Sequence, residues 1–176
     1  FIIVIGSSGT PKATDKNKKT AEFFNKAWND KYFSDCIVRY DYQITDSDIK
    51  NANLFLIGDF TSNKILKNLE GRIPISIENN KITIADHPVN GRDLNVYMAY
   101  PNPENCGKFI GIFSGSIEQN IFNLMDISKS EFIRLLSLYG EEAAYFDISC
   151  FGWYDYKVWD NSGTNLYSGY FDDDHS

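Results

Sequence analysis

The first 28 residues, FIIVIGSSGTPKATDKNKKTAEFFNKAW, combine an apolar run, a turn of small residues and an amphipathic helix. Residues 1–5 are continuously apolar and rich in β-branched side chains, which is typical of a strand buried on both faces. Thr10 is a good N-cap residue, and Pro11 suits the first turn of the helix that follows. A strand, a tight turn and a helix in this order predict an α/β fold.

The alternation of strands and helices continues along the chain. The sequence predicts strands over 36–40, 53–58 and 108–115, a short helix that begins near residue 46, and a helix over 62–69. Thr45 and Asp48 form a capping box before the short helix. Strands joined through helices require right-handed crossovers, so we expect a mainly parallel sheet.

Between these elements and after them the pattern changes. Residues 75–85 alternate between apolar and polar side chains and turn at Asn79–Asn80, which predicts a β-hairpin. The other expected elements are a strand that ends against the prolines near 101, two helices capped by Ser116 and Ser128, and aromatic strands that break at Asn161–Ser162–Gly163.

These patterns predict one α/β domain over residues 1–176. We expect three layers around a mainly parallel, flavodoxin- or Rossmann-like sheet, with an added β-hairpin and aromatic C-terminal edge strands. The first residue already lies inside a strand and is not Met, so we expect the sequence to be excised from a longer chain. The absence of a signal peptide therefore says nothing about the compartment.

Composition excludes several classes of function. The net charge of −7 argues against a protein that binds the phosphate backbone of nucleic acids, because that needs a basic face. Cys36, Cys106 and Cys150 include no CxxC pair, which excludes a zinc knuckle and gives no disulfide framework. The longest apolar run falls short of the roughly 20 residues that span a bilayer.

Polar residues follow the predicted parallel strands, at the edge where open α/β sheets bind ligands. A turn of small residues before a helix presents backbone N–H groups to an anion, as in FMN-binding loops of flavodoxins. The candidate ligand-binding residues are Ser7, Ser8, Gly9, Thr10, Asp59 and Ser114, and the candidate ligand is FMN or a nucleotide.

The alternative is that Gly6 and Gly9 only make a tight turn and Thr10 only caps the helix. GSSGTP lacks both the GxGxxG spacing and the lysine of GxxxxGK[ST], and Pro11 removes one N–H donor. Asp41 and Asp59 at neighbouring strand ends could hold magnesium, but acidic residues are common at such positions.

No catalytic constellation or metal site is expected from the sequence. GIFSG at 111–115 misses the GxSxG elbow by one position, so Ser114 is a poor nucleophile candidate. His87, beside Pro88 in an expected loop, and His175 have no carboxylate at a persuasive spacing. The tail DDDH at 172–175 could chelate a cation, but such a terminal segment is more typical of a solvated chain end.

The aromatic residues of 151–159 fit an edge strand over the core, or a docking surface for a partner or a sugar.

Four segments resemble one family of domains. They are GSSGT after the first strand, NANLFLIGDFTSNKIL at 51–66, YPNPENCGKFIGIFSG at 100–115, and GYFDDD at 169–174, which is similar to a closing GFFD segment. In this order they resemble the C-terminal, flavodoxin-like domain of bacterial prolyl-oligopeptidase-type α/β-hydrolases, a family of peptidases and carbohydrate esterases.

The resemblance implies an accessory domain without catalytic residues, because in that family the catalytic serine belongs to the neighbouring hydrolase domain. It implies that the partner is this α/β-hydrolase domain in the same parent chain, with no nucleic acid partner and no membrane span, and leaves a homo-oligomer open. A periplasmic or extracellular location is likewise an implication of the resemblance.

Overall fold

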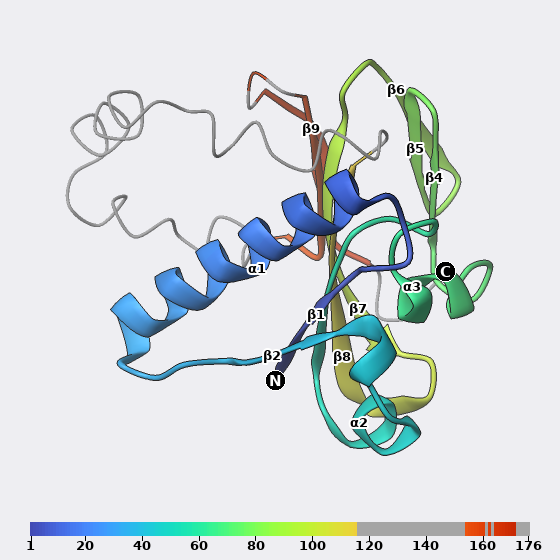
Figure 1. Ribbon diagram of the computed structural model, residues 1–176. Coiled ribbons are helices and arrows are strands. Elements are labelled where there is room, and N and C mark those ends of the chain that lie inside the picture. Colours follow the sequence, from blue (N-terminus) through green and yellow to red (C-terminus); the bar gives the residue numbers. More distant parts are fainter. Residues whose placement is uncertain (116–153, 161, 163, 172–176) are drawn as a thin grey trace.

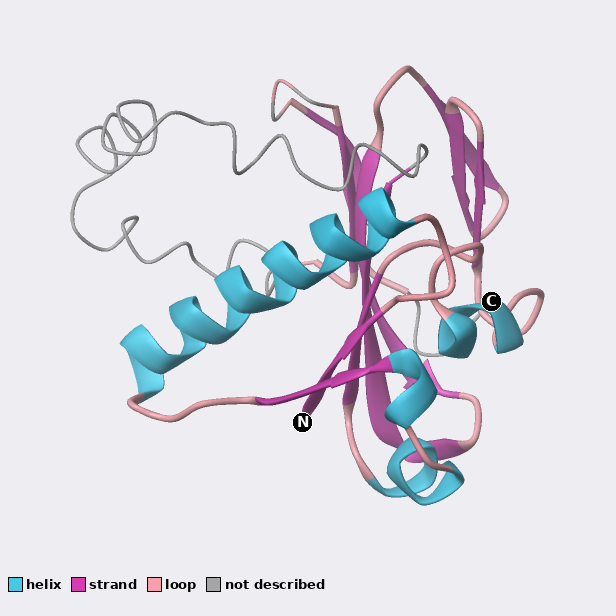
Figure 2. Ribbon diagram, viewed as in Figure 1, coloured by secondary structure: helices cyan, strands magenta, loops and turns pink. Residues whose placement is uncertain are grey.

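The computed structural model describes residues 1–115, 154–160, 162 and 164–171 (Figure 1). A seven-stranded sheet carries helix α1 (Pro11–Tyr32) on one face (Figures 1 and 2). The opposite face carries α2 (Asp46–Asn51), α3 (Lys64–Asn68) and a small sheet of β4 (Ile75–Glu78), β5 (Lys81–Ile84) and β6 (His87–Asn90).

The large sheet is mixed, with strand order β10-β9-β7-β8-β3-β1-β2. Its strands are β1 (Ile2–Ile5), β2 (Ile37–Tyr40), β3 (Leu54–Ile57), β7 (Asn95–Asn102), β8 (Asn105–Gly115), β9 (Tyr156–Trp159) and β10 (Asn165–Gly169). Strands β2, β1, β3 and β8 are parallel to one another. Strands β7, β9 and β10 are added by antiparallel pairing. The chain is therefore mixed α/β, and the expected mainly parallel sheet is found only for these four strands.

Two features of the strands differ from the sequence prediction. Strand β7 does not end before its prolines but runs through Pro101, which pairs with Phe109 next to a shift in the β7–β8 register. His87 and Pro88 do not lie in a loop but belong to β6, which adds a third strand to the predicted hairpin. Proline is tolerated there because β6 is an edge strand of the small sheet.

Alternation along the central strands builds an apolar core on each face of the large sheet. Ile2 and Val4 of β1 belong to the core under α2, α3 and the small sheet. Ile3 and Ile5 belong to the core under α1, together with Phe24 of the predicted helical stripe. All four residues of β1 are buried, so the prediction of a strand buried on both faces is confirmed.

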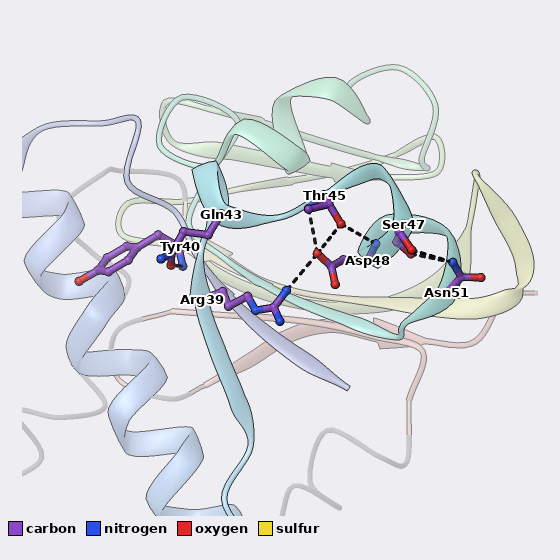
Figure 3. A network of polar contacts seen from close by, with 7 residues as sticks. All are labelled: Arg39, Tyr40, Gln43, Thr45, Ser47, Asp48 and Asn51. Atoms are coloured by element: carbon purple, nitrogen blue, oxygen red, sulfur yellow. Dashed lines mark hydrogen bonds and ion pairs between the residues drawn. The ribbon is translucent and has the colours of Figure 1, made fainter.

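Helix α2 begins at the predicted capping box (Figure 3). The amide of Asp48 donates to the Thr45 hydroxyl over 3.1 Å, and the amide of Thr45 donates back to the Asp48 carboxylate over 2.9 Å. Arg39 of β2 contacts the same carboxylate at 3.0 Å and so ties the helix to the sheet.

We expect Thr45→Ala to lower the free energy of unfolding by about 1 kcal/mol, because it removes the oxygen that accepts the Asp48 amide. Ser47→Ala is the matched control, since its hydroxyl contacts only the exposed Asn51 side chain, at 3.2 Å. Urea unfolding of the two variants measures the difference. Equal stability of Thr45→Ala and Ser47→Ala would contradict the capping role.

Several predictions fall on residues outside the described part of the chain. These are the helices capped by Ser116 and Ser128, the aromatic residues Phe151 and Trp153, the thiol of Cys150, and the tail with His175. Within the described part, the C-terminal aromatic strands lie at one end of the large sheet, as predicted, and their antiparallel pairing is a further finding.

Candidate functional site

The carboxyl ends of the parallel strands meet at one edge of the large sheet. Ser7 lies just after β1, Asp41 directly after β2, and Asp59 just after β3. Of the predicted ligand-binding residues, Ser7 and Ser8 share one contact, because both hydroxyls donate to the Asp41 carboxylate. At this edge the connection after β1 leads to β2 on one side, and the connection after β3 leads to β7 and β8 on the other side, so the edge is the candidate functional site.

The Asp41 carboxylate is enclosed by four hydrogen-bond donors, which we call the Asp41 cage. Oδ1 accepts from the Ser7 hydroxyl at 2.5 Å and from the Tyr42 amide at 3.0 Å. Oδ2 accepts from the Ser8 hydroxyl at 3.0 Å and from the Lys64 amide at 2.8 Å. Asp41 is only 2% exposed, so the cage shields it from water. The turn of small residues thus binds an anion that belongs to the chain itself.

Asp41 is held in its charged form. Burial alone raises the pKa of this carboxyl, because it disfavours the charged state. Hydrogen bonds from the Lys64 amide and from Ser7 and Ser8 favour the carboxylate and outweigh burial, so the pKa of Asp41 lies below its usual range. A carboxylate of this kind is a fixed negative charge and a poor proton donor at neutral pH.

Asp59 is bonded to its own loop. Its Oδ1 accepts from the amide and hydroxyl of Thr61 at 2.9 and 2.8 Å, and from the Ser62 amide at 2.7 Å. Asn63, in the same loop, donates to the carbonyl of Ile57 at 3.1 Å and caps α3. These bonds fix the loop after β3 but do not bring Asp59 to the Asp41 cage.

The other predicted ligand-binding residues have structural roles. Thr10 caps α1 by accepting from the Ala13 amide at 3.2 Å, as the alternative reading of the turn predicted. Gly9 is half-buried within the same turn. Ser114 is completely buried, and its hydroxyl has no hydrogen-bond partner among the described residues. A substrate cannot reach Ser114 while the protein has this conformation.

Sequence reasoning missed Asn17 at this edge. Its side chain lies at 0% exposure on the inner face of α1 and donates to the Gly6 carbonyl at 2.8 Å. The Oδ1 atom of Asn17 is buried, and no residue in the described part of the chain forms a hydrogen bond with it. A buried amide on the apolar side of a helix is a detectable signal, but the periodicity of α1 alone does not say what it contacts.

A second candidate is an apolar groove between α1 and the large sheet, with a volume of about 290 Å³. Its aromatic lining consists of Phe1, Phe24, Trp28, Phe55, Tyr97 and Phe109. Phe1 packs edge-on against Trp28 at 4.7 Å between ring centroids. Phe109 is 56% exposed at the rim of the groove. Apolar surface of this kind is typical of a contact with another protein surface.

The remaining candidates give no further site. His87 is exposed and stacks on Tyr167 of β10 at 4.2 Å between ring centroids. Cys36 and Cys106 are free thiols, and burial raises the pKa of the Cys36 thiol. Across the described ranges, no group of three His, Cys, Asp or Glu side chains is placed to hold a metal ion. No helix there is long and apolar enough to cross a membrane.

A scan against models of protein families and a search of curated proteins gave no match to this chain.

Proposed function

We propose that this chain is a non-catalytic accessory domain that packs on the catalytic domain of a hydrolase, an esterase or a peptidase. The observation that carries the proposal is the apolar groove beside α1, because an accessory domain needs an apolar surface for its neighbour. The hydrolase as neighbour follows from the resemblance. The parallel order β2-β1-β3-β8 supports the flavodoxin-like part of that resemblance.

The polar edge of the sheet supports a structural role as well. The carboxylate of Asp41 is engaged by four donors, and Asp59 is bonded to its own loop. The hydroxyl of Ser114 is buried. The two carboxylates hold loops together at the edge where a catalytic residue would need to face a substrate, and the Ser114 hydroxyl is enclosed.

The isolated chain is expected not to hydrolyse p-nitrophenyl esters or peptide anilides. Turnover by the purified chain that falls to zero in Ser114→Ala would contradict the proposal, because it would assign catalysis to this domain. Turnover that is unchanged in Ser114→Ala is assigned to a contaminating hydrolase only if further purification separates it from the chain, and turnover that stays with the chain also contradicts the proposal.

The packing surface can be tested in the full-length protein with Phe109→Asp. Because Phe109 is exposed, the isolated domain should keep its melting temperature within about 2 °C. In the full-length protein, calorimetry should show a larger difference between the melting temperatures of this domain and its neighbour than in the wild type. Tyr170→Asp, at a residue 62% exposed beyond β10, is the control and should leave the transitions unchanged. Identical calorimetric traces for the two full-length variants would show that the groove is not the packing surface.

The alternative function is a flavodoxin-like binding module for FMN or a nucleotide at the first strand–helix turn. It is favoured by the meeting of Ser7 and Ser8 at the carboxyl edge of the parallel strands. The Asp41 carboxylate argues against this function, because the carboxylate already accepts the hydrogen bonds from Ser7 and Ser8 that a phosphate would use. A thermal shift on addition of FMN, or yellow protein, would establish the alternative, and no response to FMN or nucleotides would end it.

A further inference from the structure

We propose that the Asp41 cage is a self-occupied oxyanion site, in which the side chain of Asp41 takes the place of a small oxyanion such as phosphate. The cage has four donors, two hydroxyls and two backbone amides, at 2.5–3.0 Å from the two carboxylate oxygens. This inference does not depend on the proposed function, since it concerns the donors and not the neighbour of the domain.

The donors of the cage come from three parts of the chain that are far apart in sequence. Ser7 and Ser8 lie 34 and 33 residues before Asp41, and Lys64 lies 23 residues after it. Only Tyr42 is a sequence neighbour. The turn that carries Ser7 and Ser8 is also held by backbone bonds, from the Gly6 amide to the Ile57 carbonyl and from the Ser8 amide to the Ser62 carbonyl. These bonds do not involve the carboxylate, so the donors should keep their positions when it is removed.

The geometry of the donors suits a tetrahedral or planar oxyanion. Each carboxylate oxygen accepts one hydroxyl and one amide, so two oxygens of a phosphate or sulfate can be bonded in the same way. The turn after β1 is also the place where an open parallel sheet usually binds an anion. In the wild-type protein Asp41 fills this place, and it repels a second anion because it is charged.

Asp41→Gly opens the cage, whereas Asp41→Asn fills it with an uncharged side chain of nearly the same shape. We expect inorganic phosphate to raise the melting temperature of Asp41→Gly by about 4 °C when its concentration is roughly ten times its dissociation constant. Sodium chloride at equal ionic strength should give no such rise. Phosphate also strengthens apolar burial in any protein, so the rise is measured as the excess over the wild type and Asp41→Asn, whose cages are filled.

Each result decides the inference. A phosphate-specific rise in Asp41→Gly alone supports it, and an equal rise in Asp41→Asn, or no rise in Asp41→Gly, overturns it. Asp41→Gly could also be unfolded in buffer. In that case circular dichroism measures refolding: helix signal and a cooperative melt that return with phosphate, but not with sodium chloride, support the site. Continued absence of structure in phosphate overturns it.

Discussion

Asp41→Asn is expected to lower the free energy of unfolding by about 3 kcal/mol at neutral pH, although the new side chain has almost the same size and shape. Each carboxylate oxygen faces one backbone amide, from Tyr42 or from Lys64. Whichever way the asparagine amide is turned, its NH₂ group therefore meets a backbone N–H that cannot accept a hydrogen bond. The other bonds lose the charge that strengthens them.

The stability contributed by Asp41 depends on pH with a definite sign. Its folded-state pKa is lowered, because the hydrogen bonds of the cage outweigh the effect of burial. The contribution is therefore complete above the unfolded-state pKa of about 3.9 and is lost as the pH falls through the folded-state pKa. Urea unfolding of the wild type and Asp41→Asn should show a stability difference that is constant near neutrality and narrows below about pH 4.

Asp86→Asn is the matched control for this prediction. Asp86 lies in the exposed turn between β5 and β6, so the substitution removes the same charge without opening a buried set of donors. Its free energy of unfolding should stay within about 0.5 kcal/mol of the wild type. If Asp41→Asn is as stable as Asp86→Asn at pH 7, the cage contributes nothing to the fold.

The sequence allowed prediction of the features that depend on close neighbours in the chain. Thr10 caps α1, and Thr45 with Asp48 caps α2, because each of these bonds joins residues three positions apart. The apolar run of residues 1–5 predicted a strand buried on both faces, since β1 packs on both cores. Local hydrogen bonding and periodicity carry such signals directly.

The features that were missed depend on residues far apart in the chain. Asp41 was expected at the same edge as Ser7 and Ser8, but its bonds to them and to the Lys64 amide depend on the strand order β2-β1-β3, which no local pattern contains. The antiparallel half of the sheet was missed for a similar reason. Residues 96–115 predicted two strands, but only the close turn at Asn102–Asn105 pairs β7 with β8 and reverses the chain.

Gly6→Ala is expected to have the second large effect, a loss of about 3 kcal/mol or more in the free energy of unfolding. A Cβ atom at Gly6 would lie 2.7 Å from the Ser62 carbonyl oxygen and 2.8 Å from that of Ile57. Both are backbone atoms that hold the edge together, since the Ile57 carbonyl accepts from the Gly6 amide and the Ser62 carbonyl from the Ser8 amide. The turn after β1 must therefore move away from β3.

Gly107→Ala is the control, because a Cβ atom there meets only the Asn105 side chain, at 3.3 Å, on the exposed part of β8. Urea unfolding should place Gly107→Ala within about 1 kcal/mol of the wild type. A Gly6→Ala protein as stable as Gly107→Ala would mean that the close approach of the turn to β3 is not required.

The double variant Gly6→Ala/Asp41→Asn separates two explanations of these losses. If Gly6 allows the close approach that places Ser7 and Ser8 around Asp41, then Gly6→Ala already weakens the cage. The second substitution should then cost less than it does alone, by about 1 kcal/mol or more in a double-mutant cycle. Strictly additive losses would show that the turn and the cage stabilise the fold independently, and that Gly6 acts only through its contacts with β3.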